Sequence, residues 1–245
     1  MILVKYGEIA LKGGNRHLFE KKLQNNIKSC LKKNNVEYEK VQRVRGRILI
    51  ITEQECPKLK DVFGIHSFSY IKPITLDLEI MKKEALKLYE KGTFRVSCKR
   101  SDKIFLKSPE IEREVGAYIV EKTNAKVKLK NPETEIFIEV FNNQAHIYNK
   151  KHMGLGGLPV GIQGTVGLLL QDESSIEAGI KLMKRGCDLI LIKEKDINIE
   201  KLKQYEYGFR LDYGTKEDVF ALVVNDTIKN IKEYDEDKLI LRPLI

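Results

Sequence analysis

The chain of 245 residues lacks any apolar run of the roughly 18–20 residues that a membrane-spanning helix needs. Its first residues, MILVKYGEIALKGGNR, are a short apolar run closed by glycines, which is typical of a first strand and not of a signal peptide. The sequence also has no internal repeat and no low-complexity tract. These absences argue against a membrane protein and predict a cytoplasmic one.

Cysteine and histidine are scarce, with four residues of each. The cysteines include no Cys-x-x-Cys pair, and the histidines form no catalytic spacing with Ser, Asp or Cys. We expect the cysteines to be small buried side chains and the histidines to be structural or surface residues. The sequence therefore predicts no metal site and no catalytic residue. The residues concerned are Cys30, Cys56, Cys98, Cys187, His17, His66, His146 and His152.

Negative charge is scarce in the first part of the chain. Residues 1–150 hold 30 Lys and Arg against 19 Asp and Glu, whereas residues 151–245 hold 14 against 16. All of the excess positive charge behind the net charge of +9 therefore lies in residues 1–150. A polyanionic partner explains this asymmetry, because neutralised phosphates dominate nucleic-acid affinity. Solvated lysine-rich helix faces are the alternative that charge alone leaves open.

Residues 1–72 have the order strand, helix, strand, strand, helix, strand that is typical of a ferredoxin-like domain. Asn15 is expected to cap the first helix, whose apolar residues recur at helical spacing from Phe19 to Leu31. A turn at Arg45-Gly46-Arg47 joins the middle strands. The predicted strands are Ile2–Tyr6, Val36–Val44, Arg47–Thr52 and Ser67–Lys72, and the second helix is Pro57–Phe63.

A second α/β unit is predicted over residues 73–153, after a boundary marked by Pro73 and Asp77. Its first helix begins at Leu78 and ends near Gly92. Its second helix opens with Ser108 as the N-cap, followed by Pro109 and Glu110. The predicted strands are Thr93–Lys99, Lys126–Leu129, Ile136–Phe141 and Ala145–Tyr148.

A Gly/Pro-rich linker over residues 154–163 leads to a third region, residues 164–245. This region is short for a doubly wound domain, and we expect a reduced Rossmann-like sheet of parallel strands. The predicted elements are the strands Val166–Leu170, Cys187–Lys193, Val219–Val224 and Leu239–Leu241 and the helix Ser174–Arg185.

Two groups of polar residues are placed to meet phosphates. Lys12, Asn15 and Arg16 lie at a glycine-flanked helix start, although a tight turn with solvated charges would look the same. A second group flanks the strand at 93–99, in which alternation places Arg95 and Ser97 on one face and apolar residues on the other. Such cations suit RNA backbones and single-stranded ends. The second group is Arg95, Lys99, Arg100, Lys103 and Lys107.

Four segments make the chain resemble the ThiI-type tRNA 4-thiouridine sulfurtransferase family. They are YGEIALKGGNR, FRVSCKRSDKIFLKSPEIEREVGAYI, LKNPETEIFIEV and GLGGLPVGIQGTVGLLL, and the match is strong over residues 1–170. The resemblance implies a ferredoxin-like and a THUMP domain that grip the tRNA acceptor end. In that family a PP-loop domain then adenylates a uridine with ATP, and a persulfide supplies the sulfur. It also implies that Lys12, Asn15, Arg16, Arg95, Lys99, Arg100 and Lys103 face tRNA.

The third region departs from the family. A Ser-Gly-Gly-x-Asp-Ser loop should follow the strand at 166–170, but Gln171, Asp172, Glu173, Ser174 and Ser175 stand there. Side chains in place of glycines restrict the approach of a pyrophosphate, and two carboxylates repel it. Nothing matches the family's catalytic cysteine. ATP and Mg²⁺, which active members use, are therefore not expected here.

Two hypotheses follow. In the first, the chain is a tRNA-binding protein that has lost its own adenylation, with a full-length sulfurtransferase or another tRNA-modification protein as partner. In the second, it is a divergent or split sulfurtransferase that acts in tRNA thiolation with a partner chain. A protein-binding structural module is a weaker third reading, and homodimerisation stays open.

Overall fold

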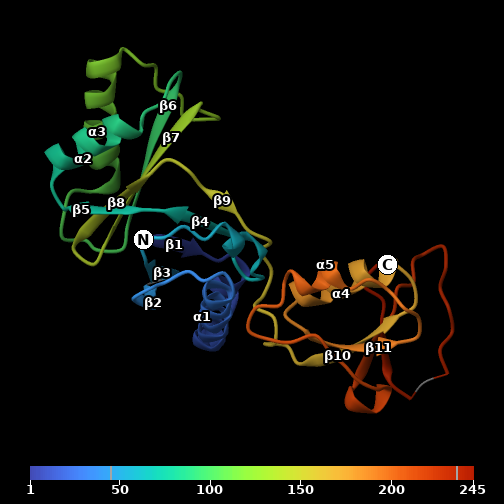
Figure 1. The fold of residues 1–245 in the computed structure, drawn as a ribbon. Helices are drawn as coiled ribbons and strands as arrows, with labels where there is room; N and C mark the ends of the chain where they lie inside the picture. The colour runs from blue at the N-terminus through green and yellow to red at the C-terminus, as the bar shows by residue number, and fades with distance from the viewer. Residues whose placement is uncertain (45, 236) are drawn as a thin grey trace. The chain divides into compact units, whose positions relative to one another are not determined.

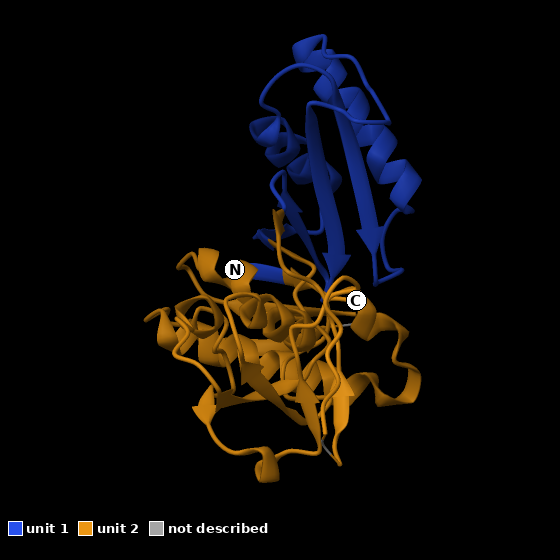
Figure 2. Cartoon of the chain, turned by 90° about the vertical axis from the view of Figure 1, so that its right-hand side faces the viewer, with its two compact units in different colours: residues 1–3, 69–151 blue, residues 4–68, 152–245 orange. Residues whose placement is uncertain are grey.

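The computed structural model describes residues 1–44, 46–235 and 237–245 (Figure 1). They form two compact units, Met1–Leu3 with Ser69–Lys151 and Val4–Phe68 with His152–Ile245 (Figure 2). Arg45, expected in a turn, lies outside the described residues. Within the described residues, no helix combines the length and the apolar character that crossing a membrane requires.

The first sheet has the strand order β2-β3-β1-β4-β9, and its first four strands follow the ferredoxin-like arrangement. Helix α1 (Arg16–Lys33) buries Phe19, Leu23 and Ile27, as the helical spacing predicts. Two 3-10 turns, Glu8–Leu11 and Gly13–Asn15, precede it. The strands are β1 (Ile2–Lys5), β2 (Lys40–Val44), β3 (Arg47–Ile51), β4 (Ser67–Tyr70) and β9 (His152–Met153).

Three expectations for this part are corrected. Asn15 stands at the N-cap position of α1 but makes no side-chain capping bond. Strand β2 begins at Lys40 and not at Val36. The Val36 N–H donates to the Leu31 carbonyl at 2.9 Å, so Val36 still belongs to the turn that ends α1. The predicted second helix is only the 3-10 turn Pro57–Asp61.

The second sheet has the order β5-β8-β7-β6, and the helices α2 (Leu78–Leu88) and α3 (Ser108–Thr123) pack on it through one apolar cluster. In that cluster Met81 and Ala85 of α2 and Ile111 and Val115 of α3 pack with Phe94 of the sheet. Asp77 caps α2 by accepting a 2.9 Å hydrogen bond from the Ile80 N–H. The strands are β5 (Lys72–Thr75), β6 (Phe94–Arg100), β7 (Thr134–Phe141) and β8 (Gln144–Tyr148).

Pro73, expected to mark a domain boundary, lies in β5, an edge strand, where a missing N–H is tolerated. Two predictions for this sheet were wrong. Residues 126–129 form no strand, and an isolated bridge joins Val127 to Phe94 of β6. Ser108 is the first residue inside α3, and the cap belongs to Lys107, whose N–H donates to Glu110 Oε2 at 2.8 Å.

The third sheet is parallel throughout and has the order β12-β11-β10-β13-β14. In chain order this is 3-2-1-4-5, so the direction of winding reverses between β10 and β13, where doubly wound folds bind ligands. The helices are α4 (Ser174–Lys184) and the short α5 (Glu200–Lys203). The strands are β10 (Thr165–Leu170), β11 (Asp188–Lys193), β12 (Asp212–Tyr213), β13 (Ala221–Val223) and β14 (Leu239–Leu241).

Contacts inside the larger unit join α1 to the third sheet. Phe63 belongs to the same apolar cluster as Val160, Leu168 and Met183. The Asn26 Nδ2 donates to the Val160 carbonyl at 3.2 Å, and Lys33 pairs with Glu206 at 3.3 Å. Within the larger unit, α1 and Phe63 therefore pack against the third region.

Candidate nucleic-acid interface

Strand β6 divides its side chains as predicted: Phe94, Val96 and Cys98 enter the core, and Arg95 and Lys99 lie on the other face. Arg95 is already engaged, because its NH1 donates to the Leu129 carbonyl at 3.1 Å and its Nε lies 3.9 Å from Glu135. Ser97 also donates to Glu135, at 2.6 Å. Lys99 is exposed and is the cation of this strand best placed to meet a polyanion.

The loop between β6 and α3 carries the other predicted cations. Arg100 organises the loop, since its NH1 donates to the Phe105 carbonyl at 2.8 Å. Lys103 and Lys107 point to solvent, next to Ile104, which is 63% exposed. Within the described chain, no ion pair is found for Lys99, Lys103 or Lys107. Lys99 at the end of β6 and the two lysines of the following loop form an exposed group of cations, named the basic loop below.

The residues at the start of α1 are locally engaged. Lys12 Nζ lies 5.2 Å above the Phe19 ring, and Arg16 donates to the Ala10 carbonyl. Asn15 is exposed. Lys12 and Arg16 thus hold the turn before α1, and Asn15 beside them is free of a capping role.

A polar groove of about 590 Å³ lies between α1 and the edge strand β2. Arg16 lines it together with Lys40 and Arg43. Among its described lining residues the one carboxylate is that of Glu20, 3.8 Å from Arg43. Sequence reasoning missed Lys40 and Arg43. The density of cations between residues 40 and 47 is the signal that would have indicated them.

The loop that follows β10 is closed on itself. Ser175 Oγ accepts hydrogen bonds from the N–H groups of Gln171 at 3.0 Å and Asp172 at 3.4 Å. Asp172 Oδ1 accepts the Ser174 N–H at 2.8 Å and the Ser174 hydroxyl at 2.6 Å. These bonds, led by that of the Ser174 hydroxyl, hold the pKa of Asp172 below its usual value. Glu173 is exposed at the cap of α4.

A second polar network lies beside this loop, at the end of β13. The Asn225 amide donates to Ser174 Oγ at 2.9 Å. Asp226 is 1% exposed and accepts from Tyr234 at 2.9 Å and from Arg242 Nε at 3.0 Å. The Tyr234 hydroxyl also lies 3.3 Å from Gln171 Oε1. Side chains of the chain itself therefore occupy the place where the winding of the sheet reverses.

This loop does not fit the polyphosphate of ATP in the manner of a glycine-rich loop. Such a loop needs unpaired backbone N–H groups that point at the ligand. Here the N–H groups of Gln171, Asp172 and Ser174 are bonded to side chains, and two carboxylates stand at the loop.

Cysteine burial agrees with the sequence expectation for three of four residues. Cys30, Cys56 and Cys98 are buried free thiols, and Cys187 is half-buried. Burial raises the pKa of Cys98 to about 11, which disfavours the reactive thiolate. Across residues 1–44, 46–235 and 237–245, no three Asp, Glu, His or Cys side chains are grouped as metal ligands.

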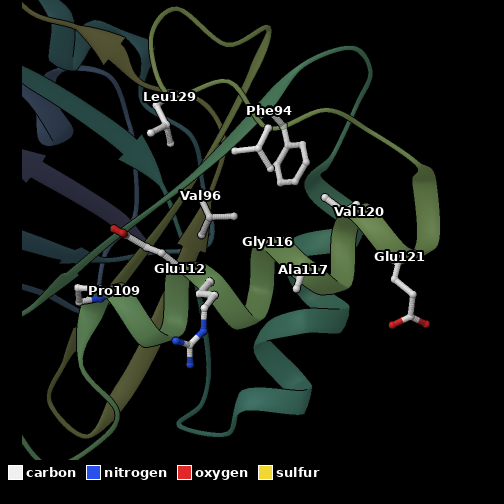
Figure 3. Close-up of a pocket in the computed structure, with 11 residues that line it drawn as sticks. Phe94, Val96, Pro109, Glu112, Gly116, Ala117, Val120, Glu121 and Leu129 are labelled. Atoms are coloured by element: carbon white, nitrogen blue, oxygen red, sulfur yellow. The ribbon is translucent and has the colours of Figure 1, made fainter.

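An apolar groove of about 620 Å³ lies between β6 and α3 (Figure 3). Its lining is apolar except for Glu112, Arg113 and Glu121. Such a lining suits apolar ligands better than ions. The apolar lining residues are Phe94, Val96, Pro109, Gly116, Ala117, Val120, Val127 and Leu129.

Family models match two parts of the chain. Residues 1–69 match the ThiI ferredoxin-like domain, and residues 77–149 match the THUMP domain. A probable tRNA sulfurtransferase of Thermococcus kodakarensis is 35% identical over 97% of this chain and 68% of its own length. One of Clostridium kluyveri is 41% identical over 77% of this chain, which spans only 51% of that relative.

Two solved structures are similar. PH1313 from Pyrococcus horikoshii is 32% identical, with a TM-score of 0.88 over 100% of this chain and 94% of that one. A 4-thiouridine synthetase, solved as an RNA complex with bound ATP, is 33% identical, with a TM-score of 0.66 over 78% of this chain and 52% of that one.

Proposed function

This chain belongs to the tRNA sulfurtransferase family, and from that premise we propose that it binds tRNA by the acceptor region without adenylating it alone. In this proposal residues 1–72 are the ferredoxin-like domain and residues 73–153 the THUMP domain. A linker over residues 154–163 precedes a degenerate PP-loop domain over residues 164–245. The protein acts in the cytoplasm.

The exposed basic loop carries this proposal. Lys99, Lys103 and Lys107 lie within nine residues and are exposed, so their charges can meet phosphates without breaking existing ion pairs. Lys40 and Arg43 add cations at the polar groove. Arg95 and Arg100 serve chiefly to shape the basic surface, since both guanidinium groups donate to backbone carbonyls.

Loss of adenylation is supported by the closed loop. Replacing the bonds of Ser175 and Asp172 with bonds to phosphate would leave polar groups unpaired, which costs free energy. A relative that adenylates tRNA, or another tRNA-modification protein, would supply the chemistry as partner.

One observation favours the second candidate function, a split or divergent enzyme in tRNA thiolation. The third sheet keeps the order in which the winding reverses between β10 and β13, with polar side chains at the carboxyl ends of both strands. A partner chain bound there would complete a reaction site. Thiolation of tRNA by the purified chain alone would contradict the first candidate.

We expect the purified chain to bind tRNA tightly, with an affinity that falls steeply with salt, and to bind more weakly a tRNA without its 3′-terminal nucleotides. Phosphate contacts make log K fall with log salt by about 0.7–0.9 for each contact. Titration of both RNAs at two salt concentrations measures this. Equal, weak binding to every RNA would refute acceptor-end recognition.

We expect ATP with Mg²⁺ to leave the melting temperature of the chain unchanged. A ligand at 100 times its Kd stabilises a folded protein by about 2.7 kcal/mol, so a bound nucleotide would be readily visible. Thermal melting with and without ATP and Mg²⁺ checks this, with tRNA as the positive control. A clear rise with ATP would show that the third region still holds a nucleotide.

A further inference from the structure

Two of the four cysteines meet in the core of the larger unit. Cys30 lies on the buried face of α1, and Cys56 stands directly before the 3-10 turn Pro57–Asp61. A hydrogen bond joins their thiols, neither of which is in a disulfide, and their exposed fractions are 0% and 1%. Because the two residues are distant in the sequence, it is the packing of α1 that brings them together.

The backbone on both sides of this pair is held in place. A residue before proline is kept out of helical conformations, and Cys56, which precedes Pro57, has φ −137° and ψ 81°. Cys30 belongs to the last turn of α1, where the Asn34 amide donates to its carbonyl at 2.8 Å and lies 3.7 Å from its Sγ. The two sulfur atoms are therefore kept in contact by the fold.

The two thiols are chemically different. The Cys30 thiol donates to the Cys56 sulfur, and this bond lowers the pKa of Cys56, with help from two backbone N–H groups of the turn that follows and against the effect of burial. The same bond, followed by burial, raises the pKa of Cys30. Burial also raises the pKa values of Cys98 and Cys187. Cys56 is thus the cysteine whose thiolate is favoured, and the thiolate is the nucleophilic form.

Burial decides which oxidant reaches the pair. Cys56 is buried, but its chain neighbours Glu55 and Pro57 are exposed, so its thiol lies beneath a surface segment. Local openings of such a segment need little free energy and admit a small neutral molecule. Hydrogen peroxide meets that description, whereas a disulfide such as oxidised glutathione is too large and too charged to enter. A small peroxide is therefore the class of reagent that fits this site.

We propose that Cys30 and Cys56 are a modification site at which a small peroxide forms an intramolecular disulfide. In the first step the Cys56 thiolate attacks the peroxide, so that an S–O bond forms, the O–O bond breaks and hydroxide leaves. In the second step the Cys30 thiol gives its proton to that hydroxide, and its sulfur attacks the sulfur of the Cys56 sulfenic acid. The S–S bond forms, the S–O bond breaks, and the departing hydroxide takes up the proton that Cys56 first lost. Two thiols are thereby oxidised to a disulfide, and the peroxide is reduced to water.

The disulfide would border the third region. The Tyr207 hydroxyl is hydrogen-bonded to the Cys30 sulfur, and Lys33 Nζ lies 5.6 Å above the Tyr207 ring. A cross-link from α1 to the turn Pro57–Asp61 constrains the unfolded chain and so stabilises the folded one. We expect the melting temperature to rise by roughly 5–10 °C on oxidation and to return to its first value when a dithiol reduces the disulfide.

The test exposes the folded, reduced chain to hydrogen peroxide, alkylates the remaining thiols and maps the products by mass spectrometry. We expect a linked pair of peptides that contain Cys30 and Cys56, with Cys98 and Cys187 alkylated. Cys98→Ser is the matched control and should form the same disulfide at the same rate. Cys30→Ser removes the second thiol, so the Cys56 sulfenic acid should accumulate and react with dimedone. Oxidised glutathione should leave the pair reduced over the same period.

The mapping of the unmodified chain decides the matter, so the result stands even if Cys30→Ser does not fold. No link in the folded chain, a link that forms only after denaturation, or a link through Cys98 or Cys187 would each overturn the proposal. An oxidised chain that melts below the reduced one would do the same, because the folded pair would then not accommodate a disulfide.

Discussion

Lys99→Glu combined with Lys103→Glu is expected to weaken tRNA binding by roughly 100-fold or more at physiological salt. Both side chains are exposed on the basic loop and both lack an ion pair in the described structure, so their replacement removes two phosphate contacts and adds two repulsive charges. The slope of log K against log salt should also fall, by about 1 for each lost lysine. Titration against tRNA at several salt concentrations measures both quantities.

Lys99 and Lys103 are chosen so that the change in affinity reports the change in charge and not a disturbed fold. Arg100 holds the Phe105 carbonyl, so a change there would disturb the loop as well as the charge. Lys195→Glu with Lys201→Glu makes the same change in net charge on exposed sites of the third region and serves as the control. If both double variants lost affinity equally, net charge and not the basic loop would govern binding.

Asp226→Asn is expected to destabilise the larger unit by about 3 kcal/mol, because removing one partner of a buried ion pair leaves the other charge uncompensated. Asp226 has a fully buried side chain, whereas that of Arg242 is 30% exposed, which keeps the expected loss at the lower end of the usual range. The melting temperature should fall by roughly 10 °C. Asp235→Asn, an exposed carboxylate in the same segment, should change the stability by no more than about 0.5 kcal/mol.

The same carboxylate predicts a pH dependence. Burial by itself raises the pKa of Asp226, but hydrogen bonds from the Lys232 N–H, Tyr234 and Arg242 outweigh it and lower the pKa from 3.8. A lowered pKa gives stability that is present above pH 3.8 and is lost as the pH falls through the folded-state pKa. Melting curves of the unmodified chain and Asp226→Asn should therefore converge in acid. A constant difference down to the lowest pH would show that the charge of Asp226 contributes nothing.

The loop after β10 shows which features of a site can be predicted from local sequence and which cannot. The absence of glycines at Gln171 and Asp172 is readable from the sequence, because backbone freedom is a property of each residue. The hydrogen bonds that close the loop could not be predicted from the sequence. Asn225 reaches Ser174 across 51 residues, and Arg242 reaches Asp226 only because the parallel sheet brings the ends of β13 and β14 together.

The sequence alone determined the alternation of β6, the helical face of α1 and the excess of cations before residue 150, since each depends on residue type and short-range spacing. Only the tertiary structure decided that residues 126–129 border β6 without forming a strand and that Gly116 opens onto a groove. The groove and the hydrogen-bond networks depend on which elements, distant in the sequence, become neighbours in the fold. Residue spacing does not show which elements become neighbours, because that is decided by how whole helices and strands pack.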